Sequence, residues 1–453
     1  MVDYPIMARD LASIVGAPQV TSTLEELAAW AVDGQVPGLA VFPRGLEEVE
    51  RVVTCAERQG AAIVPRGAGT RMAMGSPPRR VDLIVGTKRL DRIVDLDADN
   101  LTITAQAGVT LEQAQAVLAA HGQTLPLDPP FPFSTLGGVI ATNASGPKRL
   151  AYGAPRDLVL GLKAVLADGR LVSPGGKVVK NVAGYDMGKL FIGSIGTLGF
   201  LVEVTLRTVP TPEAERMLVA SFGSLSQALE VSGHLLRSAL RPAAAAVLSD
   251  QASNRLPDGV TESLPKTGYL LFLSAAGSTE ATARQMEGFR RQCGDAGAAE
   301  MTEPAGGRLT AVWTAIGALQ MGIPIYESAT VCRVGVPISA LGRTLEAVER
   351  LVSAAGLRLS MLAYTGVGVA YCSLTSAEPV LACLDRFVRA LTDLSTISQQ
   401  AGGRMVIQSA PLEVKQRVDV WGRPGSDFRL MQGLKRKLDP KGIFNPGRFI
   451  GAI

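Results

Sequence analysis

Histidine and paired cysteine are scarce in this sequence of 453 residues. There are 2 histidines, His121 and His234, which are too few to build a multi-histidine metal site. The 5 cysteines stand at positions 55, 293, 332, 372 and 383, and no two of them have the C-x-x-C spacing. Zinc-ribbon, ferredoxin-like and thioredoxin-like sites therefore have no support. We expect reduced, mostly buried cysteines in a cytoplasmic protein.

Excess charge and long apolar runs are lacking as well. The 45 basic and 41 acidic residues leave a net charge of 45 − 41 = +4, too small on this length to indicate binding to nucleic acid or to an anionic membrane. No stretch of 18 uncharged apolar residues occurs, so no transmembrane segment is expected, and the N-terminus lacks the features of a secretory signal. The 47% of hydrophobic residues predict a globular protein with a large core.

The pattern of strands and helices changes along the chain. Up to residue 212, short β-branched strands alternate with glycine-rich loops, and residues 46–60 form an expected amphipathic helix. Residues 213–411 combine strand-like segments with long amphipathic helices, which predicts an antiparallel sheet covered by helices and an α+β fold class. One of these helices is expected over 379–394, opening on a proline. A tail over 412–453 follows as a third part.

Three segments of small residues, each beside an expected strand, are candidates for binding a cofactor. The first, Pro65-Arg66-Gly67-Ala68-Gly69-Thr70, could wrap a diphosphate with its amide groups, although an ordinary turn explains it equally well alone. It is not a Rossmann turn, because position 72 is Met and the residues after it cannot start a long helix. The second, residues 134–146, fits either a flat ring and its diphosphate tail or a tightly packed helix. The third is residues 193–199.

Taken together, these segments resemble a known family. The sequence is similar to the FAD-binding domain of vanillyl-alcohol oxidase and p-cresol methylhydroxylase and, more narrowly, to the E-type FAD-binding subunit of bacterial glycolate oxidase. The resemblance is strong over residues 40–210 and 420–450, and its specific parts are the Lys180-Asn181-Val182-Ala183-Gly184-Tyr185-Asp186 run and the Phe444-Asn445-Pro446-Gly447-Arg448 tail. The remaining parts are residues 65–70, 107–109, 125–130, 135–146, 152–153, 156–157, 175–179, 193–199 and 438–443.

This resemblance implies a PCMH-type FAD-binding domain of two subdomains, a second α+β cap domain, and a tail that returns to the FAD domain. The first segment would hold the pyrophosphate, the second would follow the flavin and ribityl chain, and the third would face the adenosine. The cofactor-binding residues that the resemblance implies are Pro65, Arg66, Gly67, Ala68, Gly69, Thr70, Gly75, Pro129, Ser134, Thr135, Leu136, Gly137, Gly138, Ala141, Thr142, Asn143, Ser145, Gly146, Tyr152, Gly153, Gly193, Gly196, Thr197, Gly199, Phe200 and Asn445.

Two departures from the family pattern shape the functional expectation. Some relatives attach FAD covalently through a histidine in the first segment, where this chain has Thr70, so we expect noncovalent FAD. Relatives that oxidise 2-hydroxy acids carry a histidine-rich metal motif in the second domain, and its counterpart here, residues 363–371, has neither histidine nor carboxylate. No metal site and no catalytic base can be assigned.

The leading hypothesis is therefore an FAD-binding subunit of a glycolate oxidase or 2-hydroxy-acid dehydrogenase complex, partnered by a catalytic FAD subunit and an iron–sulfur subunit. Such a chain would be cytoplasmic and would reach a membrane only through its partners. A self-sufficient FAD-linked D-2-hydroxy-acid dehydrogenase is one alternative. A scaffold subunit of the same complex without redox activity is the other.

Overall fold

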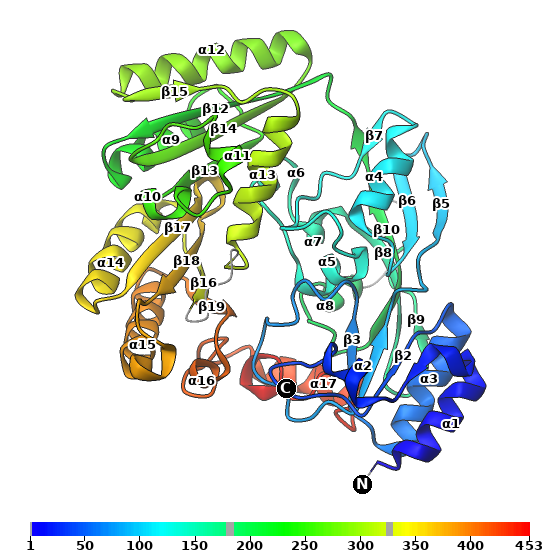
Figure 1. The fold of residues 1–453 in the computed structure, drawn as a ribbon. Coiled ribbons are helices and arrows are strands. Elements are labelled where there is room, and N and C mark those ends of the chain that lie inside the picture. Colours follow the sequence, from blue (N-terminus) through cyan, green and yellow to red (C-terminus); the bar gives the residue numbers. More distant parts are fainter. Residues whose placement is uncertain (1, 178–184, 323–328) are drawn as a thin grey trace. The chain divides into compact units, whose positions relative to one another are not determined.

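The computed structural model describes residues 2–177, 185–322 and 329–453. The chain divides into two compact units (Figure 1). Unit 1 comprises Met1–Ala144, Ala154–Thr211 and Arg423–Ile453, and unit 2 comprises Ser145–Gly153 and Pro212–Gly422. The division differs from the expected boundaries at 212 and 411 in two respects. A short segment within the first part, 145–153, joins unit 2, and the return to unit 1 begins at Arg423.

Unit 1 is built on two sheets. The first has the order β1-β2-β4-β3, in which β2, β4 and β3 run parallel and β1 is antiparallel to β2. The second has the order β5-β6-β10-β8-β9 and is antiparallel throughout. The strands are β1 (Val20–Thr21), β2 (Leu39–Val41), β3 (Ile63–Arg66), β4 (Leu83–Gly86), β5 (Ile93–Asp97), β6 (Thr102–Gln106), β8 (Val159–Val165), β9 (Leu171–Val172) and β10 (Phe200–Arg207), with a separate ribbon of β7 (Gln123–Thr124) and β11 (Val209–Pro210).

Helices cover both sheets of unit 1. The expected helix over 46–60 is confirmed as α3 (Leu46–Gln59), which buries Val49, Val52 and Val53 and ends at Gly60 in the left-handed conformation (φ 63°). Such a left-handed glycine satisfies the last carbonyls of a helix without steric cost. The other helices are α1 (Tyr4–Val15), α2 (Leu24–Ala28), α4 (Leu111–Ala119), α5 (Leu136–Thr142), α7 (Pro155–Leu158), α8 (Gly188–Phe191) and α17 (Phe428–Leu438), with 3-10 turns η1 (Ala17–Gln19) and η5 (Ile450–Ala452).

Unit 2 is a single antiparallel sheet of eight strands, as its sequence pattern predicts. The strand order is β15-β12-β14-β13-β17-β18-β16-β19. The strands are β12 (Ala214–Phe222), β13 (Ala244–Leu248), β14 (Tyr269–Gly277), β15 (Glu300–Thr302), β16 (Thr330–Gly335), β17 (Arg358–Tyr364), β18 (Val369–Thr375) and β19 (Arg404–Ser409).

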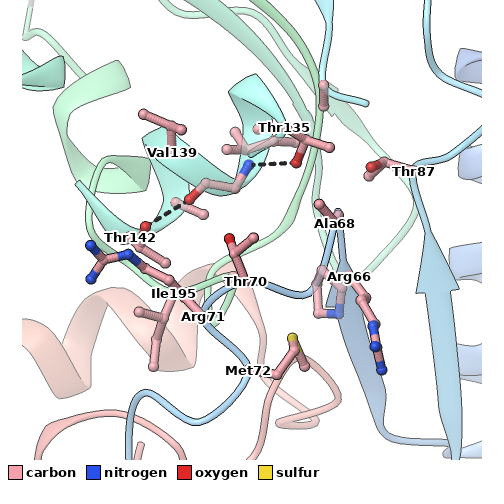
Figure 2. Close-up of a pocket in the computed structure, with 18 of the residues that line it drawn as sticks. Arg66, Ala68, Thr70, Arg71, Met72, Thr87, Thr135, Val139, Thr142 and Ile195 are labelled. Atoms are coloured by element: carbon pink, nitrogen blue, oxygen red, sulfur yellow. Dashed lines mark hydrogen bonds between the residues drawn. The ribbon is translucent and has the colours of Figure 1, made fainter. Parts of the chain in front are cut away.

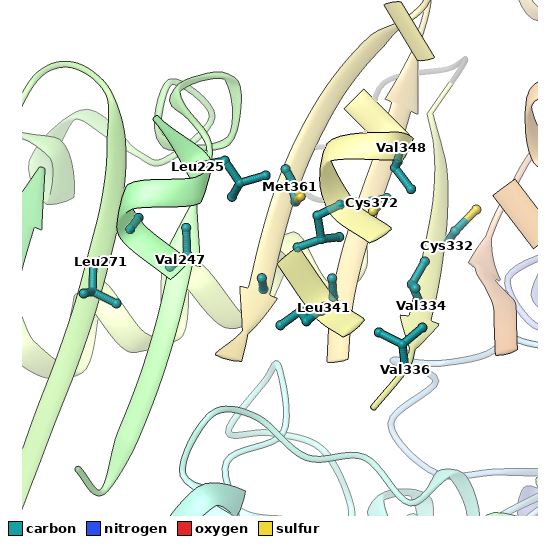
Figure 3. Close-up of a cluster of buried hydrophobic side chains, with 14 of the residues drawn as sticks. Leu225, Val247, Leu271, Cys332, Val334, Val336, Leu341, Val348, Met361 and Cys372 are labelled. Atoms are coloured by element: carbon teal, nitrogen blue, oxygen red, sulfur yellow. The ribbon is translucent and has the colours of Figure 1, made fainter. Parts of the chain in front are cut away.

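Each face of this sheet has its own apolar core. One face packs against α9, α12, α14 and α15, with residues such as Leu271, Val334 and Leu341 between them (Figure 3). The opposite face packs against α10, α11 and α13 and includes Tyr364 and Tyr371. The helices are α6 (Arg149–Tyr152), α9 (Leu225–Arg237), α10 (Asp250–Ser253), α11 (Asp258–Thr261), α12 (Thr279–Asp295), α13 (Gly307–Leu319), α14 (Leu341–Ala354), α15 (Leu384–Gln400) and α16 (Leu412–Lys415), with 3-10 turns η2 (Ile338–Ala340), η3 (Thr365–Val367) and η4 (Val380–Ala382).

The helix expected over 379–394 is shifted along the chain. Pro379 is followed by the 3-10 turn η4, and the α-helix begins only after Cys383, whose backbone (φ −122°, ψ 15°) is not helical. Leu381, which the helical pattern placed among apolar neighbours, is exposed. The helix then continues to Gln400, because its own side chains Leu391, Leu394 and Ser398 remain on the buried face.

All five cysteines are free and buried, as the sequence predicts. Cys332 and Cys372 face each other across the β16–β18 pair in the apolar core of unit 2. Burial raises the pKa of the Cys372 thiol to about 12, because the thiolate would lose its hydration there. These cysteines therefore fill space in the core rather than act as nucleophiles.

Candidate functional site

Strand β3 leads directly into the first of the three small-residue segments. We call residues 66–71 the 66–71 loop. The chain leaves the sheet after Arg66, the last residue of β3, and passes close to the start of α5. A Cβ atom on Gly67 would lie 2.1 Å from Thr135 Oγ1, so only glycine permits this approach. The hydroxyls of Thr70 and Ser134 lie 3.4 Å apart and link the loop to the residues before α5.

Helix α5 is the core of the second segment and is fixed at its first turn. Thr135 is the N-cap, and its hydroxyl accepts a hydrogen bond from Gly138 N (3.3 Å; Figure 2). The amides of Leu136 and Gly137 donate to Val109 O and Ala107 O, both at 2.8 Å. Because these amides already have acceptors, α5 contributes a wall of small side chains rather than an anion-binding helix terminus.

The third segment, which we call the 193–199 loop, holds the other end of α5. Gly193 N donates to Ile140 O (3.0 Å) and Ile195 N donates to Ala141 O (2.8 Å). Gly193 and Gly196 have positive φ angles of 80° and 70°, which glycine adopts without strain. The loop therefore satisfies carbonyls at the end of α5 and lies against the same wall.

The C-terminal tail connects the two loops. Asn445 N donates to Ile63 O at 2.8 Å, and Asn445 Nδ2 donates to Ile195 O at 2.6 Å. Arg448 is buried, and its Nη2 donates to Met72 O at 2.7 Å and to Met74 O. Burial lowers the pKa of the Arg448 guanidinium, and the nearby Asp33 carboxylate opposes that shift.

These four elements of unit 1 surround a pocket. The 66–71 loop lies on one side of it and α5 on the other (Figure 2). The space between these elements, open solvent at the mouth included, is about 880 Å³. The lining residues are Pro65, Arg66, Gly67, Ala68, Gly69, Thr70, Arg71, Met72, Met74, Thr87, Ala107, Ser134, Thr135, Gly137, Gly138, Val139, Ala141, Thr142, Ala144, Ile195, Gly196, Gly199, Phe200, Leu201, Asn445 and Arg448.

Several polar groups at this pocket lack a protein partner. Within the described part of the chain, no residue accepts a hydrogen bond from the amides of residues 67–70. Two further atoms of pocket-lining residues, Thr87 Oγ1 and Asn445 Oδ1, are buried without a hydrogen-bond partner in the same part of the chain. Successive free amides suit a diphosphate, and a buried amide oxygen suits a ring N–H or a ribityl hydroxyl. The pocket therefore fits the extended dinucleotide that the family resemblance implies.

The charged groups of the lining are all basic. Arg66 extends away from α5, stacks on the Trp30 ring at 4.5 Å and donates to Ala29 O at 3.3 Å, and burial lowers the pKa of its guanidinium (Figure 2). Arg71 and Arg448 add two more positive charges. Among the residues that the structure describes, the lining contains no Asp, Glu, His, Lys, Cys or Tyr. The pocket can therefore attract and orient an anionic cofactor but offers no ordinary proton acceptor.

The structure brings 16 of the 26 expected cofactor residues to this pocket. Of the others, Gly75, Pro129, Leu136, Asn143, Gly193 and Thr197 belong to unit 1 and are absent from the lining. Ser145, Gly146, Tyr152 and Gly153 belong to unit 2, where their segment is held by the Lys148–Glu215 ion pair (2.8 Å) and by Leu150 packed against Gly366.

The list of expected cofactor residues omitted ten lining residues, namely Arg71, Met72, Met74, Thr87, Ala107, Val139, Ala144, Ile195, Leu201 and Arg448. Five of them, Ala107, Val139, Ala144, Ile195 and Arg448, lie within segments that the sequence analysis had marked, whereas Met72, Met74, Thr87 and Leu201 stand outside every motif. Arg71 could have been found, because a basic residue directly after a glycine loop is a recognisable signal for a phosphate.

The Lys180–Asp186 run, a specific part of the resemblance, lies mostly outside the described residues. Lys180 is among the residues not described, so whether it and Asp186 flank the flavin, face a partner or form a structural ion pair stays open. Asp186 itself lies 3.7 Å from Lys189 Nζ. Tyr185 is 94% exposed and therefore does not fill the core.

Comparison with known proteins identifies the family. A family model described as an FAD binding domain matches residues 37–175, and a second, for the C-terminal domain of FAD linked oxidases, matches residues 211–405 and 422–449. Glycolate oxidase subunit GlcD of Bacillus subtilis is 30% identical over 91% of this chain and 89% of its own length. A D-2-hydroxyglutarate dehydrogenase of Xanthomonas citri pv. viticola is 29% identical over 91% and 89%.

Solved structures show the same fold. p-Cresol methylhydroxylase with substrate bound superposes with a TM-score of 0.77 at 15% identity, covering 98% of this chain and 96% of that one. An alkyldihydroxyacetonephosphate synthase superposes with a TM-score of 0.73 at 18% identity, covering 98% and 85%. The expected PCMH-type fold is thereby confirmed. The chain belongs to the FAD-linked oxidase family and is an FAD-dependent oxidoreductase.

Proposed function

We propose that this chain is a noncovalent FAD-binding subunit of a complex that oxidises a 2-hydroxy acid to a 2-oxo acid. FAD supplies the two-electron acceptor, and an iron–sulfur partner receives the electrons. Glycolate, D-lactate and D-2-hydroxyglutarate, which appear in the names of relatives, are all 2-hydroxy acids. The word subunit in the name of the glycolate oxidase relative supports a multi-subunit assembly.

In this proposal the pocket of unit 1 binds and orients the cofactor. The free amides of residues 67–70 and the Arg71 guanidinium would hold the diphosphate, because they line the pocket together and both kinds of group favour an anion. The small side chains along α5, among them Ala141 and Thr142, would lie along the flavin and its ribityl chain. Asn445 Oδ1 would accept a hydrogen bond from the cofactor. Every one of these residues positions the cofactor, and none moves a proton.

The observation that carries the subunit role is the absence of acid–base and metal-binding side chains where the family would place them. The lining, as far as the described ranges 2–177, 185–322 and 329–453 form it, lacks carboxylate and imidazole groups. In unit 2, the stretch 363–371 contributes Tyr364 and Tyr371, whose rings lie 5.8 Å apart in an apolar cluster. The Tyr364 hydroxyl accepts a hydrogen bond from Gln320 at 2.8 Å. We therefore assign the chain to the E type, with substrate oxidation centred on a separate catalytic flavoprotein.

The purified chain alone should keep its flavin oxidised in the presence of glycolate or D-lactate. The reason is that deprotonating the substrate hydroxyl needs a base that the pocket lacks. The measurement is the visible flavin absorbance under anaerobic conditions, with dithionite as the control that the flavin can be reduced. Rapid bleaching by either acid would contradict the proposal and favour a self-sufficient dehydrogenase. The D-lactate dehydrogenase relative gives that alternative its support.

Co-purification from the native source tests the partner side of the proposal. We expect iron and one further flavoprotein to remain with this chain through size-exclusion chromatography, and about one FAD per copy of this chain. Iron-free material of a single chain would contradict the complex. A chain without flavin would favour the scaffold alternative instead.

Within the part of the chain that the structure describes, no helix is both long and apolar enough to cross a bilayer.

Acid precipitation should release all of the FAD into the supernatant. Covalent attachment of a flavin requires a nucleophilic side chain such as His, Cys or Tyr beside the ring, and the described lining has none. Thr70 stands where the resemblance places the attaching histidine, and both histidines of the chain are exposed and outside the pocket. Yellow flavin retained in the protein pellet, after a wash in denaturant, would contradict this expectation.

A further inference from the structure

A buried ion pair lies at the end of α17, outside the pocket lining. Lys435 and Asp439 are one helical turn apart, and only 7% and 2% of their surfaces are exposed. Burial lowers the pKa of the Lys435 ammonium, and the Asp439 carboxylate opposes that shift. A buried pair of charges adds little stability compared with a well-packed apolar pair. Its presence here calls for a role other than packing.

The hydrogen bonds of this pair reach both sides of the pocket. Lys435 Nζ donates to Asp439 Oδ2 (2.7 Å), to Thr197 O (2.7 Å) and to Phe444 O (2.9 Å), which uses all three ammonium protons. Asp439 accepts in turn from Ile443 N (2.9 Å) and Phe444 N (2.8 Å). The network is therefore complete, and each member fixes the next.

The two backbone carbonyls that accept hydrogen bonds from Lys435 lie beside different parts of the pocket lining. Thr197 lies in the 193–199 loop, between the lining residues Gly196 and Gly199. Phe444 lies in the tail, beside the edge strand β3, where Ile63 N donates to Ile443 O at 2.7 Å and Asn445 N donates to Ile63 O. Strand β3 continues directly into the 66–71 loop. One ammonium group thus ties the 193–199 loop to the strand that carries the 66–71 loop.

We propose that Lys435 is a positioning residue for FAD, because its three hydrogen bonds fix the separation of the two loops that line the pocket. This inference rests on the proposed function, which assigns that pocket to FAD. Lysine suits the role because an ammonium group donates in three directions at once, which no neutral side chain of this length can do. Asp439 keeps the ammonium charged and aims it, while also ordering the tail.

The test is Lys435→Met, which keeps the length and apolar stem of the side chain and removes the donors. We expect the dissociation constant for FAD, measured by flavin fluorescence on the apoprotein well below its unfolding temperature, to rise about tenfold or more, as for coupling between two sites in one protein. The matched control is Lys437→Met, which changes an exposed lysine of the same helix. It should leave the dissociation constant unchanged.

Two further variants separate positioning from mere stability. Leu11→Ala opens the apolar core of unit 1 around α1 and should lower the unfolding temperature without changing FAD affinity. Lys435→Met combined with Asp439→Asn removes the uncompensated buried charge but keeps only one of the two acceptors for the Ile443 and Phe444 amides, so it should recover part of the stability and none of the FAD affinity. A double variant that recovers both, or a single Lys435→Met variant that loses stability but binds FAD as the parent does, would overturn the inference.

The outcomes also distinguish this inference from the proposed function beneath it. If the pocket does not hold FAD, neither Lys435→Met nor substitutions in α5 will change FAD binding. If the pocket holds FAD but Lys435 only stabilises the tail, changes at α5 will abolish binding while Lys435→Met will not.

Discussion

Replacing Gly137 by alanine will weaken FAD binding, although alanine is the better helix former. The added Cβ would lie 2.7 Å from Ala107 Cβ and 2.9 Å from Ala107 O. Ala107 follows strand β6 and cannot move aside, so α5 must shift instead. Overpacking of this kind costs about 1–3 kcal/mol. In the proposed site, FAD binding requires α5 to return to its original position. If that return costs about 2 kcal/mol, the dissociation constant for FAD rises about 30-fold.

The measurement is FAD affinity of the purified apoprotein, with the unfolding temperature recorded beside it. Gly433→Ala is the matched control, because Gly433 lies in α17 of the same unit and its added Cβ would meet no atom within 4 Å. The control should gain up to about 1 kcal/mol of stability from helix propensity. It should bind FAD like the parent. Parental FAD affinity in a folded Gly137→Ala protein would mean that α5 is not a wall of the FAD site.

Arg448→Met will have the second large effect, on both stability and FAD content. The substitution removes the donor to Met72 O and Met74 O and leaves these carbonyls without it in a buried site. Hydrogen bonds from charged groups are each worth about 1.5–3 kcal/mol, so we expect unfolding free energy to fall by about 3 kcal/mol. The loop that loses its support follows directly on the 66–71 loop, so the purified protein should also contain less flavin.

Chemical denaturation and the flavin-to-protein absorbance ratio measure these two effects. Arg436→Met provides the comparison, because Arg436 is an exposed arginine on the nearby helix α17. Surface changes of that kind are usually worth no more than about 0.5 kcal/mol. If Arg448→Met and Arg436→Met behave alike, the tail does not support the loop.

Sequence patterns predicted the glycine-rich walls of the pocket because close approach leaves a local signature. Gly67 and Gly137 stand within recognisable runs of small residues, and the structure shows why each must be glycine. The two interpretations of residues 134–146, a packed helix and a segment that lines a cofactor pocket, are compatible. Residues 136–142 form a helix, and five of them line the pocket, so the segment has both properties.

Other features depend on contacts that no local pattern encodes. The run Ala244-Ala245-Ala246-Val247-Leu248 favours a helix by propensity, yet it forms β13, fully buried between β14 and β17. The family resemblance implied a cofactor-binding role for Ser145, Gly146, Tyr152 and Gly153, whereas contacts such as Lys148–Glu215 join their segment to unit 2. Arg448 lies 376 residues from the Met72 carbonyl that it supports, beyond the reach of any spacing rule.

The return of residues 423–453 to unit 1 has a consequence for biosynthesis. The strands of unit 2 all precede residue 423, whereas Asn445 and Arg448, which complete the pocket proposed for FAD, are the last lining residues to be made. At a synthesis rate of about 5–20 residues per second, residues 423–453 take roughly 2–6 seconds. We therefore expect cofactor binding to await the end of synthesis, and a message truncated near its 3′ end to yield a flavin-free product with most of its strands intact.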